Sequence, residues 1–176
     1  MKLIFILFPI LVLADTGALI KIVDGDTLYF KTNNKKVKCR IEYIDTPESR
    51  DNKKNERDIS NCSGITAKDM TSAGKSATRA AKRLLTINKQ YSYSTNGKDR
   101  YGRSICVVKL DHSTFNEQMI INGYAVPYRQ YMNSSELKYY NMLLEKAKSE
   151  QVGLWGDREF IIECLNRKRL KKSSMR

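Results

Sequence analysis

The sequence predicts a single α+β domain in which helices decorate a small closed β-barrel. Five short β-prone segments occur, at 17–23, 27–31, 36–44, around 91–93 and at 104–110. Helical periodicity falls between the third and fourth of these segments and again after the fifth. The length of 176 residues suits one domain with its own core, because single domains typically contain about 100–200 residues.

The strands near the N-terminus carry the clearest pattern. A tight Asp-Gly-Asp turn at 24–26 separates the first two. Residues 36–44 alternate with a period of two, which places successive side chains on opposite faces. One face carries Val37, Cys39, Ile41 and Tyr43, and the other carries Lys38, Arg40 and Glu42. Pro47 ends this strand.

Three helices are predicted. The first is amphipathic, and its apolar positions are Met70, Ala73, Ala77, Ala80, Ala81, Leu84 and Leu85. A capping box at Thr114 and Glu117 opens the second, which ends near Gly123. Asn133 or Ser134 caps the third, and Gly153 stops it. Its apolar face consists of Leu137, Tyr140, Leu144 and Ala147.

Two polar stretches are predicted to lie outside these elements. Segment 49–64 is rich in Lys, Asn, Asp and Arg and is interpreted as a long surface loop. Segment 167–176 has six basic and no acidic residues and is interpreted as a solvated, disordered end. We therefore divide the chain into a domain at 15–160 and a basic C-terminal tail at 161–176.

The charge composition indicates a polyanionic partner. Lys and Arg number 32 against 19 Asp and Glu, which gives a net charge of +13 and suits nucleic acid or an anionic membrane surface. His112 is the single histidine, so a pair of catalytic histidines and a His-rich zinc site are excluded. A Ser-His-Asp triad would have to use His112 in a turn-like run. An enzyme of this composition must use carboxylates, arginines or a metal.

The N-terminus is typical of a secretory signal peptide. Residues 1–14 contain one charge, Lys2, then an apolar run too short to span a membrane, and Val12-x-Ala14 as a small-residue cleavage signal. We predict cleavage after Ala14 and export to a periplasm or the medium, without stable membrane insertion of the cleaved chain. An uncleaved N-terminal anchor is the alternative.

Charged residues beside the predicted turns suggest a chemistry. Each alone fits a structural turn role, but together they suit phosphodiester hydrolysis. Asp26 and Asp45, together with a backbone carbonyl, would be hard oxygen ligands, and ligand type alone leaves Ca²⁺, Mg²⁺ and Mn²⁺ open. Arg40 and Arg103 could neutralise the charge that builds on phosphorus. Glu48 could take a proton from water.

Several motifs occur in an order and spacing that carry more weight than any one of them. They are Val23-Asp24-Gly25-Asp26-Thr27, Arg40-x4-Asp45-Thr46-Pro47-Glu48, Asp99-Arg100-Tyr101-Gly102-Arg103, Asn116-Glu117, Gly123-Tyr124-Ala125, Tyr128-Arg129-Gln130-Tyr131 and Gly153-Leu154-Trp155. From about residue 18 to 155 the chain resembles the staphylococcal nuclease (thermonuclease) family. The resemblance implies a five-stranded OB-fold barrel with three helices, and Ca²⁺-dependent cleavage of DNA and RNA that leaves 3′-phosphate ends.

The resemblance also implies roles for individual residues. Asp26 and Asp45 match the family's Ca²⁺ carboxylates and Thr46 its carbonyl ligand, while Glu48 matches the general base. Arg40 and Arg103 match the phosphate-binding arginines. The expected nucleotide-binding residues are Arg100, Tyr101, Tyr128 and Tyr131. Segment 49–64 looks longer than the family's corresponding loop.

Four cysteines, an even number, indicate disulfides in an exported chain, and they allow three connectivities. If Arg40 points at the site, the neighbouring Cys39 points into the barrel. Cys106 lies an odd three residues beyond Arg103 and also turns inward. If these two strands are neighbours, we expect Cys39–Cys106, which leaves Cys62–Cys164 to tie segment 49–64 to the C-terminal segment.

No element resembles a base-reading helix, so binding is expected to depend on phosphates and on stacking tyrosines. This predicts non-specific cleavage that favours single-stranded or flexible DNA and RNA, by a monomer. Two other functions stay open. One is a non-catalytic OB-fold module that binds nucleic acid. The other is a cationic surface protein that binds anionic lipid through 167–176.

Overall fold

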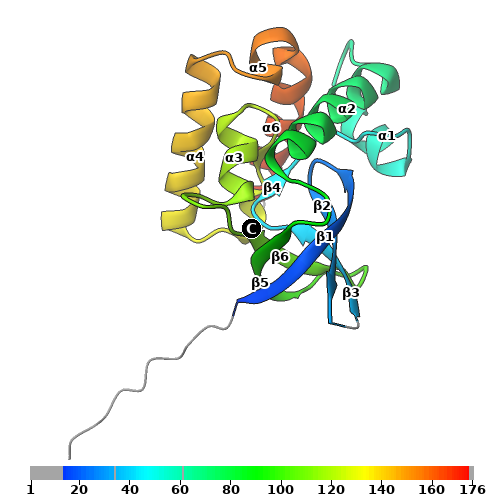
Figure 1. The fold of residues 1–176 in the computed structure, drawn as a ribbon. Coiled ribbons are helices and arrows are strands. Elements are labelled where there is room, and N and C mark those ends of the chain that lie inside the picture. The colour runs from blue at the N-terminus through cyan, green and yellow to red at the C-terminus, as the bar shows by residue number, and fades with distance from the viewer. Residues whose placement is uncertain (1–13, 34, 61, 175–176) are drawn as a thin grey trace, which may run out of the picture.

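The computed structural model describes residues 14–33, 35–60 and 62–174, and its centre is a closed five-stranded barrel (Figure 1). The strands are β1 (Asp15–Asp24), β2 (Thr27–Thr32), β3 (Lys35–Ile41), β5 (Gln90–Lys98) and β6 (Ser104–Val108). They close in the order β1-β2-β3-β6-β5, with only β3 and β6 parallel among these pairs. The predicted α+β class with a five-stranded barrel is confirmed.

A short second sheet lies beside the barrel. It pairs β4 (Ile44–Asp45) with β7 (Val126–Pro127). The predicted strand at 36–44 is therefore interrupted: β3 ends at Ile41, and Tyr43 has a φ of 62°. This break separates Asp45 from the strand that carries Arg40.

The three predicted helices are present, and further helices accompany them on one side of the barrel (Figure 1). The predicted helices are α2 (Ala67–Leu84), α3 (Phe115–Ile121) and α4 (Ser134–Ser149). The capping box at Thr114 is confirmed, and Asn133 is the cap of α4. The additional helices are α1 (Lys53–Ile59), η1 (Arg129–Tyr131), α5 (Leu154–Asp157) and α6 (Glu159–Ser174).

The interpretation of 49–64 as a loop throughout was wrong. Asn52 caps α1 by accepting hydrogen bonds from the backbone nitrogens of Lys54 and Asn55, both at 2.9 Å. Asn55 and Asp58 are buried although both are polar. Composition suggested solvent, but these side chains find partners inside the fold.

The interpretation of 167–176 as a solvated, disordered end was wrong for its described residues, because a helix continues to Ser174. Residues 159–174 form α6, which buries Ile161, Ile162 and Leu165 in the core. The side chain of Arg169 is buried as well, whereas Arg167 is exposed. The basic composition of this segment concealed Arg169, whose side chain points into the protein.

The barrel interior is apolar and cross-linked. Phe30 and Tyr93 stack at 4.8 Å between ring centroids.

The two predicted disulfides, Cys39–Cys106 between strands and Cys62–Cys164 outside the barrel, are both present, with Cα–Cα distances of 5.6 and 6.0 Å. Among the described residues, none of the helices is long and apolar enough to cross a membrane.

Candidate active site

Asp26 lies at the turn between β1 and β2, where its side chain forms hydrogen bonds with Thr46, the residue after β4. Its Oδ2 accepts hydrogen bonds from the backbone nitrogen of Thr46 at 3.0 Å and from the Thr46 hydroxyl at 3.1 Å. A Cβ at Gly25 would come within 2.8 Å of the Thr46 side chain. The glycine of the Asp-Gly-Asp turn thus allows the close approach that brings Asp26 and Thr46 together.

The Arg40 side chain extends from the outer face of β3 and forms ion pairs with both predicted metal-ligating carboxylates, Asp26 and Asp45. Its Nη2 donates to Asp45 Oδ1 at 2.8 Å and to the Ile44 carbonyl at 3.0 Å, and its Nη1 pairs with Asp26. Burial alone would lower the pKa of Arg40, but the charges of Asp26 and Asp45 outweigh it and raise that pKa. Arg40 is therefore a fixed cation between two carboxylates.

Asp45 is fully buried and faces two further cations that the sequence analysis did not identify. Arg169 of α6 donates from Nε to Asp45 Oδ2 at 2.8 Å, and its Nη2 contacts the same oxygen. Lys54 of α1 places its Nζ 3.6 Å from Asp45 Oδ1. Burial would raise the pKa of Asp45, but Arg169, Lys54 and Arg40 hold it well below its usual range.

Glu48, the predicted general base, lies within reach of the same Lys54. It accepts hydrogen bonds from Lys54 Nζ and, at 2.9 Å, from Asn52 Nδ2. A Cβ at Gly74 of α2 would come within 2.2 Å of the Glu48 carbonyl. Gly74 thus lets α2 pack directly against the segment that carries Glu48, a role with no signal in the sequence beyond a glycine inside a helix.

Arg103 and Tyr101 lie in the turn between β5 and β6. Arg103 donates from Nε to Asp99 Oδ2 at 2.7 Å, so its contacts are with its own turn and not with Asp26 or Asp45. Tyr101 is 65% exposed, with the Arg100 and Arg103 guanidinium carbons 4.8 and 5.6 Å from its ring centroid. The turn thus offers an exposed ring between two arginines.

The two predicted stacking tyrosines are neighbours. The ring centroids of Tyr128 and Tyr131 are 5.8 Å apart. The Arg169 guanidinium carbon lies 4.6 Å from the Tyr128 centroid, so Arg169 contacts both Tyr128 and Asp45. Tyr131 is 63% exposed at the outer side of this pair.

Comparison with known proteins identifies the family. A family model described as "Staphylococcal nuclease homologue" matches residues 38–157, which is more than half of the chain. The chain belongs to the Staphylococcal nuclease family. An uncharacterized protein of Methanocaldococcus jannaschii is 34% identical over 150 residues, covering 80% of this chain and 71% of that protein. An uncharacterized endonuclease of Haemophilus influenzae is 31% identical (81% and 67%), and the thermonuclease of Staphylococcus hyicus is 30% identical (77% and 71%).

Membership of the Staphylococcal nuclease family implies a metal-dependent nuclease, so the site must be tested for its fit to a cation. Among the described residues, no group of three or more His, Cys, Asp or Glu side chains is arranged to hold a metal. The donor chemistry nevertheless fits. Asp24, Asp26 and Asp45 offer carboxylate oxygens and Thr46 a carbonyl oxygen, which are the donors that hard cations prefer. Burial, more than the charges of Asp26 and Glu48, raises the pKa of Asp24 to about 7.

Asp24 is the carboxylate that the sequence analysis treated as a turn residue only. It accepts a hydrogen bond from the Asp26 backbone nitrogen at 3.2 Å. Both oxygens of Asp45 face side-chain cations, since Oδ1 lies near Arg40 and Lys54 and Oδ2 contacts Arg169.

Proposed function

We propose that this chain is an exported, Ca²⁺-dependent endonuclease that hydrolyses phosphodiester bonds of DNA and RNA without sequence specificity and leaves 3′-phosphate ends. The observation that carries the proposal is the network of Asp26, Arg40 and Asp45, built from three separate segments and adjoined by Glu48. The relatives named as endonuclease and thermonuclease support the same reaction class.

Each group of the site has a role in this proposal. Asp26, Asp45 and the Thr46 carbonyl would hold the cation, with Ca²⁺ favoured and Mg²⁺ or Mn²⁺ as alternatives. When bound, the cation supplies positive charge at the reacting phosphate. Glu48 accepts the proton of the attacking water.

The arginines act by exchanging partners. Arg40 now donates to carboxylates and Arg103 to Asp99. A phosphate presents oxygens of the same hydrogen-bonding geometry, so both guanidinium groups can donate to the phosphate as charge builds on it. A donor that strengthens its bond as charge develops stabilises the transition state more than the ground state.

The aromatic residues would bind the nucleotides on either side of the scissile bond. Tyr101 and Tyr131 are exposed, and Tyr128 adjoins Tyr131. Rings of this kind stack on any base, and Arg100 adds charge beside Tyr101. Bases that can leave a helix stack most easily, so denatured DNA should be cut faster than intact duplex.

Export rests on residues 1–14, of which 1–13 lie outside the described residues, and on the two disulfides. Disulfides persist mainly in oxidising compartments, which suits a periplasmic or secreted protein.

The test uses the disulfide-intact chain and denatured DNA, with Ca²⁺, with Mg²⁺ and with a chelator. We expect cleavage in Ca²⁺ that a chelator abolishes. Glu48→Gln should reduce the rate by about 10²–10⁴-fold, the usual contribution of a general base. Glu150→Gln is the matched control, because Glu150 is exposed at the end of α4. Cleavage that survives the chelator would refute the metal, and DNA bound without cleavage in any sample would favour the non-catalytic module.

A further inference from the structure

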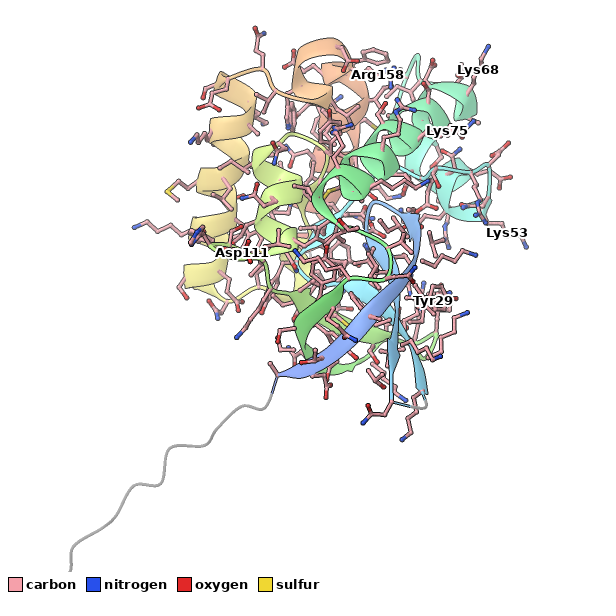
Figure 2. The ribbon with its side chains drawn as sticks, in the orientation of Figure 1. Tyr29, Lys53, Lys68, Lys75, Asp111 and Arg158 are labelled. Carbon is pink, nitrogen blue, oxygen red and sulfur yellow. A yellow bond between two sulfur atoms is a disulfide. The ribbon has the colours of Figure 1, made fainter. Side chains whose placement is uncertain are left out.

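The outer face of β2 and β3 carries a cationic and aromatic surface that the active site does not use. Tyr29 on β2 pairs directly with Lys38 on β3 and, on its other side, with Lys21 of β1. The next outward pair along the two strands is Lys31 with Lys36. We call Tyr29 and these four lysines the hairpin patch. Figure 2 shows Tyr29 on the outer side of the barrel, apart from the helices.

Two lysines of the hairpin patch lie over the ring of Tyr29. Lys36 Nζ lies 4.5 Å and Lys38 Nζ 5.6 Å from its centroid. Lys31 and Lys36 are exposed and directly opposite each other, a like-charge pairing that costs stability in a sheet. The sequences of β2 and β3 contain no Asp or Glu to offset these charges. A surface that maintains this cost, with no acidic residue in either strand, favours a polyanionic ligand.

The hairpin patch continues directly from the candidate active site. Lys36, Lys38 and Arg40 alternate along the same face of β3, and Arg40 contacts both Asp26 and Asp45. Alternate residues of a strand are about 6.8 Å apart, so the row leads away from Arg40 in steps of that length. Along the edge of β3 that faces away from β2, Cys39 pairs with Ser104 of β6. Arg103 is the residue immediately before Ser104.

We infer that the hairpin patch is an extended substrate subsite, in which Lys38 and Lys36 bind backbone phosphates beyond the one held by Arg40 and Tyr29 stacks on a base. The inference deepens the proposed function by naming the substrate class: single-stranded or flexible polynucleotides of several nucleotides, preferred over dinucleotides and trinucleotides. Phosphate contacts give affinity without sequence information, and a tyrosine ring accepts any base.

The test measures binding in a chelator, so that its outcome is separate from cleavage. Wild-type protein, Lys36→Gln/Lys38→Gln and Tyr29→Ser are titrated with single-stranded oligonucleotides of about 3 and about 12 nucleotides, and fluorescence anisotropy is recorded between about 50 and 200 mM salt. The matched control is Lys68→Gln/Lys75→Gln, which removes the same charge from exposed positions of α2, where Figure 2 labels both lysines.

We expect the Lys36→Gln/Lys38→Gln protein to lose affinity for the longer oligonucleotide by about tenfold at low salt, with a much smaller loss for the trinucleotide. Its plot of log K against log salt should be shallower by about 1.4, because each single-strand phosphate contact contributes about 0.7. Tyr29→Ser should weaken binding of the longer oligonucleotide with no change in that slope.

Equal losses in the Lys36→Gln/Lys38→Gln protein and the α2 control would overturn the inference, since the effect would then be one of net charge. An unchanged salt slope in the Lys36→Gln/Lys38→Gln protein would overturn the inference as well. Absence of cleavage by the wild-type chain in Ca²⁺ would instead count against the proposed function and leave these binding results readable.

Discussion

Replacing Arg169 by Met tests whether the C-terminal helix is part of the active site. The substitution keeps a long unbranched side chain but removes the guanidinium that contacts Asp45 Oδ2 through two nitrogens. Asp45 is fully buried, so it cannot recover this loss from water. Breaking a buried ion pair typically costs about 3–5 kcal/mol when the remaining charge is left alone.

Asp45 keeps two cationic partners in this variant, and they reduce the expected loss of unfolding free energy. Arg40 still donates at 2.8 Å, and Lys54 remains 3.6 Å away. We therefore expect Arg169→Met to lower the free energy of unfolding by about 2–3 kcal/mol in a chelator, below the range for an isolated charge. In a protein of this size that corresponds to a fall in Tm of roughly 4–12 °C.

The assay is guanidinium chloride unfolding of disulfide-intact protein in a chelator, repeated with added Ca²⁺. Arg167→Met on the same helix is the control, because Arg167 is exposed and should change stability by less than about 0.5 kcal/mol. Under the proposed function Ca²⁺ binds at Asp45, so added Ca²⁺ should stabilise Arg169→Met more than wild type, because Arg169 no longer occupies Asp45 Oδ2. Arg169→Met as stable as wild type in the chelator, or no gain in its Ca²⁺ stabilisation, would refute the reasoning.

Three other outcomes are expected. In a chelator, the folded state binds a proton at Asp24 up to about pH 7, whereas the unfolded carboxyl releases it near pH 4. Wild-type stability should therefore fall as pH rises through that interval, and Asp24→Asn should flatten this part of the curve, as thermal unfolding at several pH values would reveal. Cys62→Ser/Cys164→Ser opens a cross-link with a sequence separation of 102 and should cost about 2–5 kcal/mol by chemical unfolding, and no loss would indicate that α6 holds without it. Denatured DNA should be cut faster than duplex at low salt, and equal initial rates would contradict the stacking argument.

Local pattern was sufficient for the barrel and part of the site. The alternation in 36–44 placed Arg40 outward and Cys39 inward, and the same parity at Cys106 predicted the disulfide that the structure contains. The inward and outward assignments succeed because side chains alternate along any regular strand, and the disulfide forms because β3 and β6 are paired. Tyr43 breaks the alternation with a φ of 62°, and nothing in its residue type announces a positive φ.

The residues that sequence reasoning missed are those whose roles depend on distant partners. Arg169 contacts Asp45 across 124 positions, and Lys54 sits in a polar run that composition alone assigns to solvent. Gly74 matters because the Glu48 backbone packs against it. Each role is a property of packing between elements, which no pattern within one element encodes.

Helices α1 and α6 are held together by a disulfide and by ion pairs, and these contacts bring residues that are distant in the sequence to one site. The disulfide Cys62–Cys164 joins the segment after α1 to α6, and Lys168 pairs with Asp58 and donates to the Arg57 carbonyl at 2.9 Å. Asp58 also lies 3.2 Å from Lys54, so this buried carboxylate holds one lysine from each helix. The barrel thus supplies Asp26 and Arg40, while the α1–α6 pair supplies the cations that cover Asp45. A change within that pair should therefore alter the charge around Asp45, whereas a change at Arg40 affects Asp26 and Asp45 at once.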